Sequence, residues 1–262
     1  MPAHTDAMPM LAAAVAVCAA SGCSHACARS VYLNELPRYA MLRRIKWWNA
    51  LHINALPLLP RIPRSFIESD DWDEQLYTLH ADRRRITGMD NIDSVRVMAR
   101  FAAQLGGDGY TQGFLYLLRV LSWVFVNDDA SLYWAFVSTV DIVRPYGPLG
   151  KTMGGVPQLR GVLPFADPDF QSDLLLDLVS VRWAFILFAQ TFPHRRHLLA
   201  VWDVVLTSPE YIHKVIAAML LMYRFPNVAD PMERLMLTMD NIIDTDEDTA
   251  ALIARARVIH VS

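Results

Sequence analysis

The sequence is poor in cysteine and in charge. Its cysteines, Cys18, Cys23 and Cys27, all lie near the N-terminus. A disulfide framework is therefore excluded for the main body, which suits a reducing compartment. Charged residues make up 19% of the 262 positions, and the formal net charge is −3. Because nucleic-acid-binding domains usually carry a clearly basic face, this balance predicts no nucleic-acid partner.

One apolar run near the N-terminus is a candidate membrane or targeting segment. It extends from Met8 to Gly22, which is shorter than the ~20 residues of a transmembrane helix. No Lys or Arg precedes it, although a secretory signal has a basic start. We expect an Ala-rich N-terminal helix, packed on the body or loosely attached. A secreted or membrane-tethered helical protein directed by this run stays an alternative.

Metal-ligand patterns are weak in this sequence. Cys23, His25 and Cys27 alternate as part of a zinc site does, but no second ligand pair follows at the usual spacing. His194 and His197 also have a ligand-like spacing, but two arginines stand between them. We therefore predict no metal site.

The apolar content, 53% of the residues, is high enough to fill a sizeable core and argues against disorder. Apolar residues three and four apart predict a helix after the glycine-rich stretch 106–109. They are Phe114, Leu117, Leu118, Leu121, Val124 and Phe125. No run of alternating residues is bounded by turn dipeptides, so we expect an all-α fold with little or no β-sheet.

Capping residues mark further helix starts. Candidate starts are Asp90, with Asp93 at the third position, Asn127 to Asp129, Asp167, Thr191, Ser208, Asp230 and Thr245. The start at Asp167 predicts one long helix that carries Leu174, Leu178, Val181, Phe185 and Phe188. Trp134, Trp183 and Trp202 also lie at helical spacing, so we assign these three aromatic residues to the core.

Three prolines divide the chain near its start. Pro57, Pro60 and Pro63 forbid a continuous helix and separate an N-terminal helical piece from the body. We divide the chain into an N-terminal Ala-rich segment, residues 1–38, and a helical domain, residues 39–262.

Two short motifs carry the functional information. Arg85 lies in Asp82-Arg83-Arg84-Arg85-Ile86-Thr87, and Gln112 lies in Tyr110-Thr111-Gln112-Gly113. On a helix, residues three apart share a face, so Asp82 can restrain Arg85. Taken alone, the arginine run is typical of a solvated surface, and Gln112 is an ordinary residue at a helix start.

Together these motifs resemble the TBC-domain family, the GTPase-activating proteins of Rab GTPases. The family pattern has an I-x-x-D-x-x-R-T motif and a Y-x-Q-G-M motif. This chain departs from it at Ile86, which stands before Thr87, and at Phe114, which replaces methionine. Other segments are similar to further family motifs: Leu42 to Trp48, Trp134 to Phe136, Arg182 to Phe188 and Leu198 to Leu206 with Trp202-Asp203.

The resemblance implies a multi-helix TBC fold and a GTPase-activating function. Arg85 would act as an arginine finger, with Arg84 as the alternative in the same run, and Gln112 would orient the attacking water. Residues that would support these two or contact the partner are Asp82, Thr87, Tyr110, Gly113, Arg44 and Trp48. Asp203 would have a structural role, as a partner for a neighbouring helix end.

The same resemblance implies the partner and the setting. The partner would be a Rab-family GTPase that carries GTP and Mg²⁺, so the chain itself would need no cofactor and catalyse no reaction of its own. We expect a cytoplasmic protein of vesicle trafficking, with membrane contact only indirect, at endomembranes through the GTPase. The alternative is a non-catalytic TBC-fold module that binds a Rab GTPase or a trafficking protein.

Overall fold

All regular secondary structure in the described part of the computed structural model is helical. The structure describes residues 37–53, 58–86, 89, 93–105, 109–147, 159–162, 177–192, 194–222, 228–240 and 245–260, and these contain no β-strand. The predicted all-α class is confirmed for these residues. The N-terminal cysteines and the apolar run 8–22 lie outside them, as does most of the segment 1–38.

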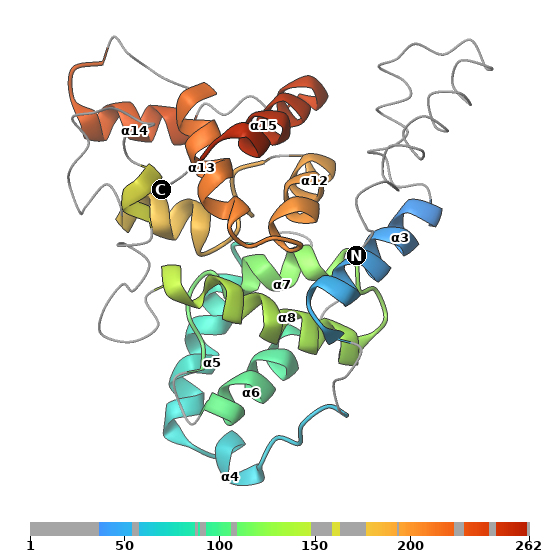
Figure 1. Ribbon diagram of the computed structural model, residues 1–262. Coiled ribbons are helices and arrows are strands. Elements are labelled where there is room, and N and C mark those ends of the chain that lie inside the picture. The colour runs from blue at the N-terminus through green and yellow to red at the C-terminus, as the bar shows by residue number, and fades with distance from the viewer. Residues whose placement is uncertain are drawn as a thin grey trace.

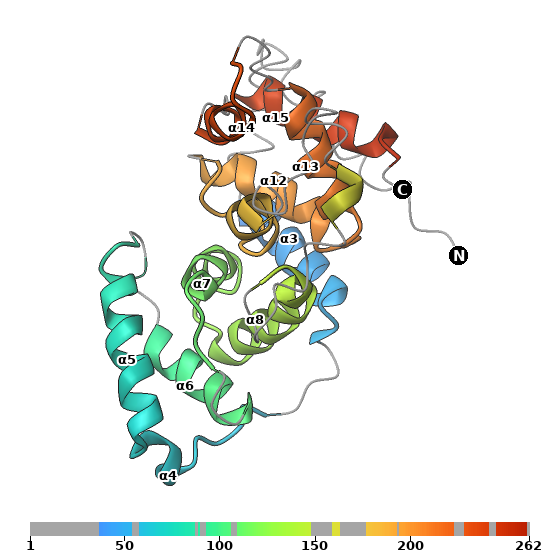
Figure 2. The same cartoon turned by 90° about the vertical axis from the view of Figure 1, so that its left-hand side faces the viewer.

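The helices form two groups, one above the other in Figures 1 and 2. Helix α3 (Pro37–Ala50) lies beside the lower group. The lower group consists of α4 (Arg64–Ile67), α5 (Asp70–Arg83), α6 (Ser94–Leu105), α7 (Phe114–Ser122), α8 (Asp129–Val143) and η2 (Arg144–Tyr146). The upper group is η3 (Arg160–Val162), the π-helical turn η4 (Ser180–Ala184), α12 (Arg195–Val205), α13 (Tyr211–Met222), α14 (Pro231–Asp240) and α15 (Asp246–Val258).

The core of the lower group is built on α7. The apolar residues that predicted this helix are all buried. The ring of Phe114 meets those of Phe101 and Phe136 edge to face, with centroids 5.5 Å and 5.6 Å away. Such pairs stabilise a core beyond the area they bury. Trp183 and Trp202 are also buried, as predicted, whereas Trp134 is only half-buried and packs against Tyr133.

Several predicted caps are confirmed by their hydrogen bonds. The carboxylate of Asp128 accepts from the backbone N–H of Ser131 at the start of α8. Thr245 accepts from Asp248 at the start of α15, and Asp230 accepts from Glu233 at the start of α14. Each cap satisfies an N–H group that the helix itself leaves without a partner.

Two predicted helix starts differ from the structure. The helix α6 begins at Ser94, and the carboxylate of Asp93 accepts from the N–H of Arg96, so Asp93 is the cap and not the third residue. Asp90 lies outside the described residues. The helix α12 begins at Arg195 with His194 in the capping position, and not at Thr191.

The predicted long helix ends before Phe188 over its described part. Residues 177–179 are helical, the π turn η4 follows, and residues 185–191 form turns. Leu187 and Phe188 have φ angles of 46° and 63°, in the left-handed region that ends a right-handed helix. Both side chains are fully buried, so packing of this apolar segment overrides its helical spacing. Asp167 and Leu174 lie outside the described residues.

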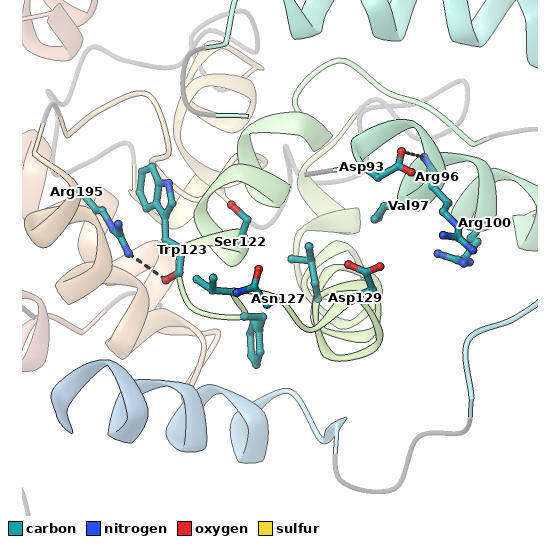
Figure 3. A pocket seen from close by; sticks show the side chains of 12 residues that line it. Asp93, Arg96, Val97, Arg100, Ser122, Trp123, Asn127, Asp129 and Arg195 are labelled. Atoms are coloured by element: carbon teal, nitrogen blue, oxygen red, sulfur yellow. Dashed lines mark hydrogen bonds between the residues drawn. The ribbon is translucent and has the colours of Figure 1, made fainter. Parts of the chain in front are cut away.

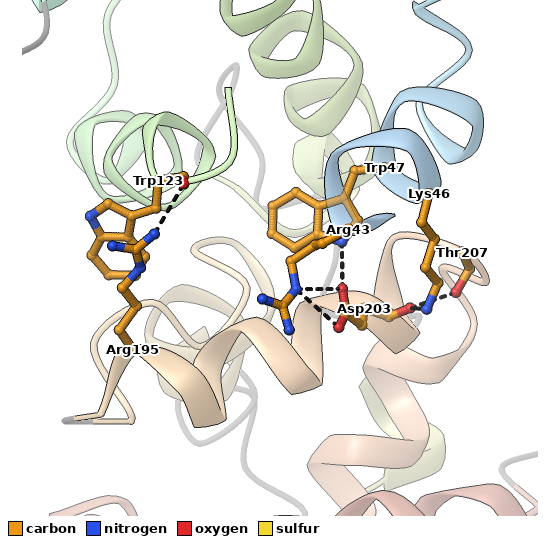
Figure 4. A network of polar contacts seen from close by, with 7 residues as sticks. All are labelled: Arg43, Lys46, Trp47, Trp123, Arg195, Asp203 and Thr207. Atoms are coloured by element: carbon orange, nitrogen blue, oxygen red, sulfur yellow. Dashed lines mark hydrogen bonds and ion pairs between the residues drawn. The ribbon is translucent and has the colours of Figure 1, made fainter. Parts of the chain in front are cut away.

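Helix α3 is joined to the body by Asp203 of α12 (Figure 4). Its carboxylate accepts from Nε of Arg43 at 3.1 Å and from Nε1 of Trp47 at 2.7 Å. The indole of Trp47 also stacks on that of Trp202, with centroids 5.5 Å apart. Asp203 thus has the predicted structural role, although it bonds the middle of α3 and not its end. The prolines after α3 do not detach it from the body.

No helix in the described parts of the chain combines the length and the apolar character needed to cross a membrane.

Candidate functional site

Arg85 lies in the turn directly after α5. The helix ends at Arg83, and the backbone N–H of Arg85 donates to the carbonyl of Asp82 at 3.0 Å. The Arg85 side chain is 69% exposed, and its Nη1 lies 3.3 Å from Oδ1 of Asp82. The predicted contact between these two residues is therefore present. The guanidinium lies at the surface, where it is open to a partner.

Asp82 joins the arginine segment to the glutamine segment. It is buried, and its second oxygen, Oδ2, accepts a hydrogen bond from the hydroxyl of Tyr110 at 2.8 Å. Burial and this hydrogen bond to Asp82 raise the pKa of the Tyr110 phenol above its ordinary value, so Tyr110 stays a donor at neutral pH. Both carboxylate oxygens of Asp82 thus have a donor, as a buried charge requires.

Gln75 holds the backbone of the same segment. Its Oε1 accepts from the N–H of Tyr110 at 3.0 Å. Sequence reasoning missed Gln75, although a signal was present. Gln75 lies seven residues before Asp82 on α5, so the two share a helix face.

Gln112 lies two residues after Tyr110 and is exposed. Two residues of chain span at most about 7 Å, so the Cα atom of Gln112 lies within that distance of the Cα atom of Tyr110. Gly113 follows as the N-cap of α7, with φ of 113°, a conformation that favours glycine. The structure thus links Arg85 and Tyr110 through Asp82, and Gln112 follows Tyr110 by two residues.

Arg44 and Trp48 lie elsewhere. The guanidinium of Arg44 forms an ion pair with Asp128 and lies 5.8 Å from the ring centroids of Trp48 and Phe125. These residues meet the turn after α7, whereas Gln112 precedes that helix. Because α7 has 9 residues, its ends are about 13 Å apart. Arg44 and Trp48 support the turn between α7 and α8.

The charge of Asp128 fits this supporting role. Burial disfavours its ionised form, but hydrogen bonds from Ser131 and the charge of Arg44 outweigh burial, so its pKa lies below the ordinary value. Thr87, the last of the predicted site residues, lies outside the described residues.

The described residues contain no group of three or more metal-ligating side chains. His197 contacts the ring of His194 edge to face and bonds to the carboxylate of Asp246. What the described residues offer is the exposed guanidinium of Arg85 and the exposed carboxamide of Gln112. Both are groups that bind the oxygens of a ligand carried by another molecule.

No family model matches this chain, and a search of curated proteins finds no match.

Proposed function

We propose that this chain is a GTPase-activating protein of the TBC type, which stimulates GTP hydrolysis by a Rab small GTPase. In this proposal Arg85 and Gln112 complete the active site of the partner. The partner carries GTP and Mg²⁺, and the chain reaches endomembranes only through that partner. The proposal rests on the motif resemblance and on one structural observation, the shared carboxylate of Asp82.

The arginine is suited to phosphoryl transfer. The transition state spreads negative charge over the oxygens of the transferred group, and a guanidinium supplied in trans stabilises it. The planar guanidinium can donate to two phosphate oxygens at once, which lysine cannot. An exposed fraction of 69% leaves the Arg85 side chain accessible to a docked partner.

The glutamine is suited to orienting water. Its amide carbonyl accepts a hydrogen bond from the attacking water, and its NH₂ group can donate to a second acceptor. The position before a rigid helix restricts the backbone of Gln112, and a restricted group is better placed for catalysis.

The Asp82–Tyr110 hydrogen bond is the observation that carries the proposal. It ties the turn that bears Arg85 to the loop that bears Gln112, although 28 residues separate its two ends. Two side chains that act on one nucleotide must be held close together, and this bond supplies such a link.

The test is single-turnover GTP hydrolysis by a panel of Rab proteins, with and without the chain. We expect at least one Rab to be stimulated, and Arg85→Ala to reduce that stimulation by about 10³-fold or more. Gln112→Ala should also reduce it strongly. The matched control is Arg64→Ala, which removes the same charge from an exposed position outside the site.

Two results would contradict the proposal. Full stimulation by both the Arg85→Ala and the Gln112→Ala variants would exclude the two-residue mechanism. Equal binding to the GDP form and to the GTP-analogue form, without any effect on hydrolysis, would favour the non-catalytic binding module instead.

A further inference from the structure

A groove lies at the far end of α7 from Gln112. It is a pocket of about 550 Å³ between the first half of α6, the turn after α7, and the starts of α8 and α12 (Figure 3). Arg96 and Arg100 of α6 line one side, and Arg195 of α12 lines the other. The groove therefore has cationic groups at both ends.

Arg100 has an unusual environment for a cation. Its exposed fraction is only 8%, and its Nε has no hydrogen-bond partner within the described residues. Arg96 lies four residues earlier on the same helix face, so two like charges face one pocket. An isolated buried charge is unfavourable unless an opposite charge accompanies it. A negatively charged occupant would remove this unfavourable state.

The carboxylates of the groove do not serve as these counter-ions. Asp93 caps α6 by accepting from the N–H of Arg96. Asp129 lies in the first turn of α8, where the helix dipole favours a negative charge. Across the described part of the chain, neither forms an ion pair with Arg96 or Arg100.

Between its two ends the groove is lined by both polar and apolar side chains, among them Ser122, Asn127 and Asp129 (Figure 3). Val126 also lines the groove and is 56% exposed, and the buried Phe125 and Leu132 line it as well. At the far end, Arg195 donates to the carbonyl of Trp123 at 3.0 Å and lies 5.0 Å from its ring centroid. A small anion would use one end only, whereas a longer ligand would use both ends and cover the exposed side chain of Val126.

We propose that this groove binds an extended acidic segment of a partner protein. One acidic side chain of that segment pairs with Arg96 and Arg100, an apolar side chain covers Val126, and a second acidic side chain reaches Arg195. The site is separate from Arg85 and Gln112, and the proposal does not depend on GTPase activation.

The test uses the full chain and a fluorescent peptide in which glutamates flank a leucine-containing centre, with binding followed by fluorescence anisotropy. The Arg96→Gln and Arg195→Gln variants should each weaken binding by about tenfold, because a hydrogen bond to a charged group contributes at least that factor. Val126→Ser should weaken it by a smaller factor. The Arg96→Gln/Arg100→Gln variant is added if its melting temperature stays near that of the unmodified chain.

The control removes the same charge elsewhere. Arg64→Gln and Arg255→Gln alter exposed arginines outside the groove and should leave the affinity unchanged. Equal weakening by these controls would overturn the proposal, since it would show non-specific attraction. Equal affinity for a peptide with glutamines in place of the glutamates would also overturn it. Displacement of the peptide by millimolar inorganic phosphate would assign the arginines to a small anion instead.

Discussion

The ring of Phe185 fills the space beside Gly113, next to the candidate site. A Cβ atom at position 113 would lie 2.9 Å from Cε1 of Phe185 and 3.1 Å from Cγ2 of Ile186. The φ angle of 113° at this glycine also lies in a region that other residues rarely adopt. The turn that presents Gln112 therefore depends on a glycine for two separate reasons.

Gly113→Ala should destabilise the fold by about 2–4 kcal/mol, because backbone strain and overpacking each contribute about 1–3 kcal/mol. Urea unfolding followed by circular dichroism measures this change. Gly113→Ala is also introduced into a Phe185→Leu variant, because the smaller side chain there leaves room for the new methyl group. An equal loss in both backgrounds would show that the clash with Phe185 is not part of the effect.

Tyr110→Phe should remove one donor from the buried carboxylate of Asp82. We expect a loss of about 1–3 kcal/mol in the free energy of unfolding, the usual effect of leaving a buried acceptor without its donor. Tyr77→Phe is the control, because Tyr77 is 80% exposed. If the two variants unfold at the same urea concentration, the Tyr110–Asp82 bond does not stabilise the fold.

Asp203→Asn should loosen α3. The substitution removes the carboxylate charge that lies 3.1 Å from Nε of Arg43, a side chain that is only 8% exposed. Breaking a buried ion pair costs about 3–5 kcal/mol, and the 20% exposure of Asp203 places the expected loss near the lower value. Hydrogen exchange should accelerate first at the amides of α3. Asp141→Asn breaks an exposed pair with Arg144 and should change stability by about 0.5 kcal/mol or less.

Stability should fall in mild acid because of His213. Burial lowers the pKa of His213 below its ordinary value of 6.5, and its Nε2 lies 2.8 Å from the hydroxyl of Tyr146. The unfolded chain therefore takes up this proton at a higher pH than the folded chain does. The contribution of neutral His213 to the free energy of unfolding is complete above pH 6.5. It is lost as the pH falls through the lower pKa that His213 has in the folded chain.

The measurement for His213 is the melting temperature between about pH 7.5 and about pH 5, a range that covers the titration of histidine. His213→Gln should reduce the decrease seen across this range. His260→Gln, at an exposed position, should leave it unchanged. An unaltered decrease in the His213→Gln variant would assign the acid sensitivity to other groups.

Local features of this fold were predictable from the sequence, and contacts between distant segments were not. The capping roles of Asp128, Asp230 and Thr245 follow from chemistry within one helical turn, and so does the Asp82–Arg85 contact. The hydrogen bond from Tyr110 to Asp82 depends on how α5 packs against the loop before α7. A single sequence carries no spacing rule for such a contact.

The segment up to Phe188 shows the opposite case, in which a local pattern misled. Its apolar residues recur at helical spacing, yet Leu187 and Phe188 adopt left-handed conformations. The same segment places Phe185 against Gly113 and Gly147. Tertiary packing around these two glycines determines the backbone conformation of this segment. The helical spacing of its apolar residues contains no information about that packing.

Asp82 accepts hydrogen bonds from both Arg85 and Tyr110, and this has a consequence for the motion of Arg85. When the guanidinium swings outward, the phenol of Tyr110 still donates to the carboxylate left behind. The movement therefore breaks the ion pair of a largely exposed arginine and leaves one of the two Asp82 oxygens without its donor. An anionic oxygen offered from outside can thus replace Asp82 as the partner of Arg85, while Tyr110 keeps the buried carboxylate hydrogen-bonded.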